Sequence, residues 1–124
     1  MTRRALHALA SLLVASAAGA ATAPAPVRAE IDALLARLEA SSCEFNRNDA
    51  WHPAARAKTH MLRKLEAMEK RTTIDGTERF IELAGTSSSM SGQPYQVRCT
   101  DAVAVPSAQW LRRELDILRK KRPL

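Results

Sequence analysis

The 124-residue sequence predicts an α+β domain that is mostly helical, with about four helices, a small two- or three-stranded antiparallel sheet and one disulfide. Three observations predict this fold class. Four segments repeat apolar residues at helical spacing, short alternating segments surround the only two cysteines, and no repeat or linker divides the chain.

The first 20 residues have the order of a secretory signal peptide. Arg3 and Arg4 precede an uncharged apolar run over residues 9–20, and the run ends in small residues at both positions that a signal peptidase reads. The run is too short to span a bilayer comfortably, although an uncleaved N-terminal anchor would show the same pattern. We therefore expect a periplasmic protein that is not an integral membrane protein.

The expected parts are a signal peptide over residues 1–20, a flexible Pro/Ala leader over 21–26 and a single globular domain over 27–124. The domain opens on a helix, because apolar residues from Val27 to Leu38 recur at helical spacing. Pro26 suits the start of this helix, since the N–H that proline lacks is not needed in the first turn.

A short strand and a second helix follow. Cys43 and Phe45 alternate with polar residues, which predicts a strand with both side chains on one face. Asn48-Asp49 predicts a turn after the strand. From about Pro53 to about Arg71 the apolar residues form one stripe, which predicts the second helix.

A third, short helix is predicted to start at Asp75. Glu78 stands three positions later, as in a capping box, and Gly85 is a natural C-terminal stop. Pro94 then returns the chain to an extended conformation, and apolar and polar residues alternate over residues 95–99. This alternation predicts a second strand.

The C-terminal part ends in a fourth helix. Val103 and Val105 predict one more short strand before it. Ser107 is the expected N-cap, and the basic residues 119–122 suit a helix C-terminus, where they complement the helix dipole.

Cys43 and Cys99 are the only cysteines, and an even count in an exported chain predicts a structural disulfide. The alternatives are a redox pair, which usually has C-x-x-C spacing, and a metal site. A metal site would need more ligands than these cysteines, His52 and His60 supply. We therefore expect a disulfide, with no metal and no cofactor.

The formal net charge is +6, and removal of the signal peptide with its two arginines leaves 17 basic and 13 acidic side chains. Export argues against nucleic acid as the partner of this basic domain. The expected counterparts are an acidic envelope protein, or an anionic cell-wall or lipid component, bound through salt-sensitive attraction. Neither a P-loop nor a Rossmann glycine pattern is present.

Four segments together resemble the DUF5329 family. They are CEFNRNDAW (43–51), AKTHMLRK (57–64), TERFIELAGTSSSMSGQPYQVRC (77–99) and PSAQWLRREL (106–115). The family consists of small exported proteins of Gram-negative bacteria, similar to the YfeK-type proteins. This chain has Asp49 where the family usually has Gly and Met61 where it often has Leu, and both changes are mild. The resemblance implies a location and a fold, but no activity.

A tentative anion-binding surface can be assembled from the polar residues of these segments. His60 lies off the apolar stripe of the second helix, with Lys64 and Arg71 on nearly the same side. The expected surface comprises Arg47, His60, Lys64, Ser91, Gly92, Tyr95 and Arg98. We therefore expect a non-enzymatic interaction or anionic-ligand-binding module, although the same residues would also form an ordinary solvated basic face.

Two other functions remain open. An envelope hydrolase would use Ser91 as nucleophile and His60 as base, although the G-x-S-x-G frame of many serine hydrolases is absent. A purely structural or stress-related protein would have no small-molecule site. Trp51, Trp110 and Tyr95 either line a sugar or peptide cleft or complete the core.

Overall fold

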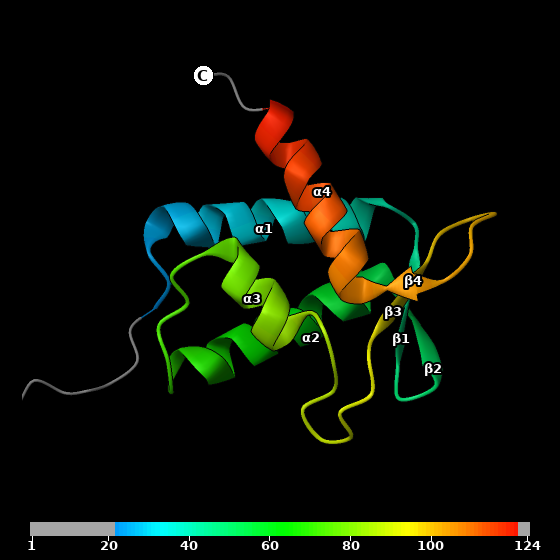
Figure 1. The fold of residues 1–124 in the computed structure, drawn as a ribbon, viewed down its shortest axis with the longest axis horizontal. Helices are drawn as coiled ribbons and strands as arrows, with labels where there is room; N and C mark the ends of the chain where they lie inside the picture. The colour runs from blue at the N-terminus through cyan, green and yellow to red at the C-terminus, as the bar shows by residue number, and fades with distance from the viewer. Residues whose placement is uncertain (1–21, 122–124) are drawn as a thin grey trace, which may run out of the picture.

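The computed structural model describes residues 22–121 (Figure 1), so the expected signal peptide lies outside the described residues. Within this range the chain forms a mostly helical α+β domain with four helices, one four-stranded antiparallel sheet and a disulfide, which confirms the predicted fold class. In chain order the elements are α1 (Ala25–Ala40), β1 (Glu44–Arg47), β2 (Ala50–Pro53), α2 (Ala54–Glu69), α3 (Thr77–Ala84), β3 (Gln96–Arg98), β4 (Val105–Pro106) and α4 (Ser107–Lys121).

The sheet contains one strand that the sequence did not predict. Strand β2 pairs antiparallel with β1 across a two-residue turn, and Arg47 faces Ala50. The turn residues Asn48 and Asp49 have φ angles of 51° and 64°, which the short hairpin requires at both positions. The four residues of β2 lack an apolar alternation, so only their pairing with β1 shows that they form a strand.

The disulfide predicted between Cys43 and Cys99 is confirmed, with a Cα–Cα distance of 4.2 Å. The strand order is β2-β1-β3-β4, and β1 pairs with β3 so that Phe45 faces Val97. The two cysteines flank this central strand pair, one just before β1 and the other just after β3. The bridge therefore joins the N-terminal and C-terminal halves of the domain at the sheet.

The helices form the larger part of the core. Helix α1 contacts α2, α3 and α4, and in Figure 1 α4 crosses α1 while the sheet lies at one end of the helices. The predicted apolar stripe of α1 is buried, with Ile31 and Leu34 fully inaccessible. Trp110 of α4 is also buried, so it completes the core. Among the described residues, no helix is long and apolar enough to cross a membrane.

Three helix starts differ from the sequence expectation. Ser107 is the first residue of α4, and its buried hydroxyl has no hydrogen-bond partner among the described residues, so it does not cap the helix. Helix α1 begins at Ala25, and the buried Ala23 donates its backbone N–H to the Glu69 carboxylate at 2.5 Å, so residues 23–26 of the expected leader belong to the folded unit. Helix α3 begins at Thr77 after Gly76, without a side-chain cap from Asp75. Glu78 pairs with Arg119 of α4, and its carboxylate also accepts a hydrogen bond from its own backbone N–H.

Candidate functional site

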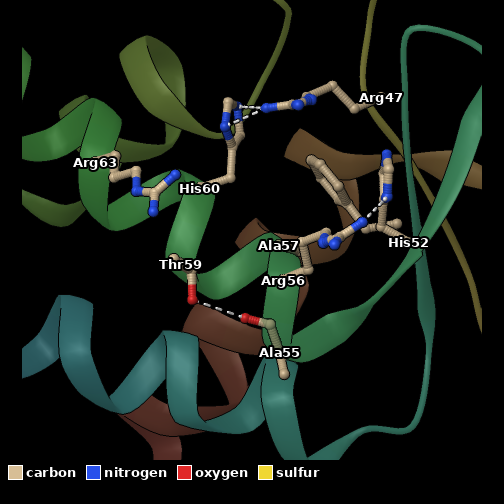
Figure 2. Close-up of a pocket in the computed structure, with 9 residues that line it drawn as sticks. Arg47, His52, Ala55, Arg56, Ala57, Thr59, His60 and Arg63 are labelled. Atoms are coloured by element: carbon tan, nitrogen blue, oxygen red, sulfur yellow. Dashed lines mark hydrogen bonds between the residues drawn. The ribbon is translucent and has the colours of Figure 1, made fainter.

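A cleft of about 500 Å³ lies between the β1–β2 hairpin and one side of α2 (Figure 2). Part of its lining is apolar, because Phe45 of β1 and Ala57 of α2 contribute to it. Ligand pockets in proteins commonly enclose about 300 to 1,000 Å³. The cleft therefore has room for a small molecule or for one group of a larger one.

Five side chains of basic residue types line this cleft, and we call them the basic cleft residues: Arg47, His52, Arg56, His60 and Arg63. Arg47 comes from β1 and His52 from β2, and the other three come from α2. Residues at positions i, i+4 and i+7 share one face of a helix, which explains why the α2 residues line the cleft together. No Asp or Glu in residues 22–121 lines the cleft.

The three cleft arginines differ from most other arginines of the domain. Arg28, Arg37, Arg79, Arg98 and Arg119 each form an ion pair with at least one carboxylate. Within the described part of the chain, no carboxylate oxygen lies within 4.0 Å of a nitrogen of Arg47, Arg56 or Arg63. Their positive charge is therefore not neutralised by the protein.

A chain of hydrogen bonds runs from the cleft into the protein. Arg47 Nη1 donates to His60 Nδ1 at 2.5 Å (Figure 2). Because a guanidinium only donates, Nδ1 must be unprotonated, and the ring hydrogen of the neutral imidazole is on Nε2. Nε2 then donates to Tyr95 Oη at 3.0 Å, and Tyr95 Oη also accepts a hydrogen bond from Lys64 Nζ at 3.2 Å. Lys64 donates in addition to the backbone oxygen of Ser87 at 2.8 Å.

Burial and neighbouring cations favour the neutral form of His60. Burial, followed by the positive charges of Arg47, Lys64, Arg63 and His52, lowers the pKa of His60 from 6.5 to about 4. Burial and the charge of Arg47 also lower the pKa of Lys64. Near neutral pH His60 is therefore an uncharged hydrogen-bonding group, in agreement with the contact from Arg47.

Residues 25–119 match the family model described as "Family of unknown function (DUF5329)". The chain belongs to the DUF5329 family. This match covers most of the chain and includes all five basic cleft residues. No curated protein and no solved structure matches the chain.

The DUF5329 domain brings together part of the surface expected from the sequence. Arg47, His60, Lys64 and Tyr95 form one connected network. Lys64 was expected on an exposed groove wall beside Arg71, but it is only 9% exposed. The loop that carries Ser87 accepts its hydrogen bond, so Lys64 supports the network from inside.

Arg98 is not part of this site. Its guanidinium lies over the Trp51 ring, 4.1 Å from the ring centre, and donates to Glu44 at 3.1 Å. Val97 next to it is buried in the core, and successive side chains of a strand point to opposite faces. Arg98 and Trp51 therefore lie on the outer face of the sheet.

Ser91 and Gly92 belong to a tight loop between α3 and β3. The buried Ser88 hydroxyl oxygen accepts hydrogen bonds from the backbone N–H groups of Met90 and Ser91, each with an N···O distance of 3.3 Å. Gly92 has a φ of 73°, which favours glycine. These contacts explain the serines and the glycine as turn residues that lead into the disulfide-linked strand.

The arrangement does not favour Ser91 as a nucleophile. Its hydroxyl donates to the side-chain oxygen of Asn48 at 2.9 Å. Both ring nitrogens of His60 have other partners in the Arg47–Tyr95 network. The described residues therefore do not form a Ser91–His60 dyad. They also contain no group of three or more His, Cys, Asp and Glu side chains that could hold a metal ion.

Three of the basic cleft residues, His52, Arg56 and Arg63, were not part of the surface expected from the sequence. Arg56 and Arg63 stand four residues before and three after His60, so the helical spacing that placed Lys64 beside it could also have found them. No spacing in the sequence could have placed His52 in the cleft, because its position depends on strand β2, which was not predicted.

The low pKa of His60 predicts a stability change in mild acid. The pKa of His60 is about 4 in the folded protein and 6.5 in the unfolded chain, so protonation of His60 favours the unfolded chain. The contribution of neutral His60 to the free energy of unfolding is therefore fully present above pH 6.5 and is lost as the pH falls to about 4. After allowance for the partial exposure of the ring, we expect the free energy of unfolding to fall by about 2 kcal/mol between pH 7.5 and pH 4. Urea unfolding of the wild type and of His60→Gln at pH 7.5 and pH 4 measures it, because the variant removes this titration. If the free energy of unfolding changed equally with pH in the wild type and in His60→Gln, the low pKa of His60 would be contradicted.

Proposed function

We propose that this DUF5329 domain is a non-enzymatic module of the Gram-negative periplasm that binds an anionic ligand in the cleft. The observation that carries the proposal is the set of three arginines, Arg47, Arg56 and Arg63, that share one cleft and lack a protein carboxylate partner. The ligand belongs to an acidic envelope protein or to an anionic cell-wall or lipid component.

The chemistry of the cleft supports an anionic ligand. A guanidinium offers a planar set of donors that matches carboxylate and phosphate oxygens in pairs. Clustered charges of one sign in a cleft with partly apolar walls raise the local concentration of the opposite ion. The three arginines alone give the cleft a formal charge of about +3, and a bound anion would relieve their mutual repulsion.

Binding fits the site better than catalysis. His60 has the wrong protonation behaviour for a general base near pH 7, because Arg47 occupies Nδ1 and the pKa of the ring is about 4. The network instead orients Arg47, whose remaining guanidinium N–H groups can donate to a ligand.

The double variant Arg56→Gln/Arg63→Gln tests the proposed function. Heparin, a sulfated polysaccharide, serves as a general anionic probe. We expect the variant to bind heparin at least about tenfold more weakly than the wild type at 50 mM salt, because two of the three arginine charges in the cleft are removed. Isothermal titration calorimetry of the purified protein measures this affinity.

Arg112→Gln/Arg113→Gln is the matched control. It removes the same charge from exposed positions of α4 that do not line the cleft. We expect this control to bind heparin within about threefold of the wild type. An equal loss in both double variants would mean that heparin responds to net charge alone, and the cleft would lose its proposed role.

The proposed location has its own test. The charged start, apolar run and small-residue end of the first 20 residues support export, and the disulfide is of the kind that persists in an oxidising compartment. After expression with its own N-terminus in a Gram-negative host, the protein is expected in the periplasmic fraction with Ala21 as its first residue. A cytoplasmic protein that still begins at Met1 would contradict export.

A further inference from the structure

The basic cleft residues fall into two groups. At one end, which we call the His60 end, Arg47 contacts His60, and Arg63 stands about one helical turn after His60 on α2. At the other end, the His52 end, Arg56 Nη1 lies 3.5 Å from His52 Nδ1 (Figure 2). In each group an arginine donates to an imidazole, so in each the arginine is held beside the cleft while keeping other N–H groups for a ligand.

The spacing of the two groups follows from helix geometry. Arg56 and Arg63 are seven residues apart on α2, which corresponds to about 10 Å along the helix axis. Arg56 and His60 are one turn apart, or about 6 Å. These backbone separations exceed the width of a single tetrahedral ion, and each end has its own Arg–His contact, so two separate anionic groups match the cleft better than one compact anion.

Charge separates phosphate from carboxylate as the ligand chemistry. A phosphomonoester carries about −1.5 to −2 charge near pH 7 and offers three oxygen acceptors, whereas a carboxylate carries −1 and offers two oxygens. Three unneutralised arginines at two separate ends are therefore matched better by phosphoryl groups than by isolated carboxylates.

We propose that the cleft takes a ligand with two phosphoryl groups held apart by an uncharged body, with one group at the His60 end and the other at the His52 end. This inference rests on the proposed anion-binding function and specifies its ligand class. The exposed Ala55 and Thr59 also line the cleft, and their methyl groups give the body of such a ligand a small apolar surface to pack against (Figure 2). A sugar bisphosphate and a phosphorylated lipid head group share this chemistry.

Three soluble probes separate charge from spacing. Fructose 1,6-bisphosphate carries its phosphoryl groups at opposite ends of a sugar, pyrophosphate carries them on one bridging oxygen, and citrate carries three carboxylates. In calorimetry at pH 7.5 and equal ionic strength, we expect fructose 1,6-bisphosphate to bind at least about tenfold more tightly than either pyrophosphate or citrate. Pyrophosphate or citrate binding as tightly as the sugar bisphosphate would overturn the two-ended site.

Single variants test whether both ends are used. Arg56→Gln and Arg63→Gln are each expected to weaken fructose 1,6-bisphosphate at least about fivefold, to near the affinity of inorganic phosphate for the wild type. Arg112→Gln, on α4 outside the cleft, is the matched single-charge control and is expected to change that affinity less than twofold. A loss confined to one of the two cleft variants would also overturn the inference, because only one end would then hold a phosphoryl group.

A displacement experiment distinguishes the source of the ligand, and the combined results show whether this inference alone fails or the anion-binding function fails as well. Displacement of the bound sugar bisphosphate by vesicles containing phosphatidylinositol 4-phosphate, whose head group carries two phosphoryl groups on an uncharged ring, and not by phosphatidylcholine vesicles, supports the two-phosphoryl site with a membrane lipid as its source. Binding of the sugar bisphosphate without displacement supports the same site with a soluble phosphorylated sugar as its source. If heparin binds through the cleft but the sugar bisphosphate has no advantage over pyrophosphate, the inference fails while the anion-binding function stands. If neither heparin nor the sugar bisphosphate depends on Arg56 and Arg63, both fail.

Discussion

Removing the Cys43–Cys99 disulfide is expected to lower the free energy of unfolding by about 4 kcal/mol. The bridge joins residues 56 positions apart, and cross-linking a loop of this length restricts the unfolded chain by about that amount in the chain-entropy model. A domain of about 100 residues is commonly stable by about 5 to 15 kcal/mol, so the loss would leave the protein marginal. The two cysteines also lie beside the central strand pair, so the bridge limits separation of β1 and β3.

Urea unfolding of the oxidised protein, the dithiothreitol-reduced protein and Cys43→Ala/Cys99→Ala measures this loss. The expected result is a lower midpoint in both bridge-free forms. Because the unfolded state without the bridge is more open, the dependence of unfolding free energy on urea is also expected to steepen. Dithiothreitol should not affect the alanine variant, which is the control for other actions of the reductant. A difference below about 1 kcal/mol would show that the folded sheet does not depend on the bridge.

Tyr95→Phe is expected to destabilise the domain by about 2 to 4 kcal/mol, although it removes a single oxygen. The ring is only 1% exposed, and Tyr95 Oη accepts hydrogen bonds from both His60 and Lys64. Phenylalanine would keep the ring packing but leave the half-buried His60 ring and the buried Lys64 ammonium without that acceptor, and each unsatisfied buried donor costs about 1 to 3 kcal/mol. Chemical denaturation at pH 7.5 measures the loss.

A double-mutant cycle with Lys64→Met identifies the source of this effect. Methionine removes the ammonium group while keeping most of the side-chain volume. In the Lys64→Met protein the Tyr95 hydroxyl therefore accepts a hydrogen bond from His60 alone, and its loss leaves only that donor without an acceptor. We expect Tyr95→Phe to cost at least about 1 kcal/mol less in the Lys64→Met protein than in the wild type. Equal costs in both proteins would show that the hydroxyl and Lys64 are not coupled. Weaker heparin binding by Tyr95→Phe in its folded state would further show that the network orients Arg47.

Much of the fold could be predicted because its signals are local. The stripe of α1 appears as a helical spacing, the Cys43–Phe45 alternation as a strand, and Asn48-Asp49 as a turn. Strand β2 could not be predicted in this way, because it is short, at the sheet edge and stabilised by pairing with β1. The expected cap at Asp75 is absent, and the pairing of Glu78 with Arg119 on a distant helix could not be read from the local sequence.

The candidate site was predicted only in part. His60 was identified because a histidine off the apolar stripe of a helix is visible in the spacing, and Arg47 because it follows the strand signal. Lys64 was placed on the surface because the same spacing does not show that the 87–94 loop covers it. Arg98 was wrongly grouped with these residues, because adjacency to the loop in sequence does not give the face of the strand on which a side chain lies.

The sequence by itself determined the helices, the two cysteine-bearing strand regions, the pairing of the only two cysteines and the family, because these depend on residue spacing, composition and motif order. Only the tertiary structure decided that Arg47, Arg56 and Arg63 meet in one cleft without a carboxylate partner, and that Lys64 lies beneath it. The physical reason is that a charge is neutralised by groups near it in space. Those groups come from a hairpin, a helix and a loop whose relative positions are set by packing of the whole core.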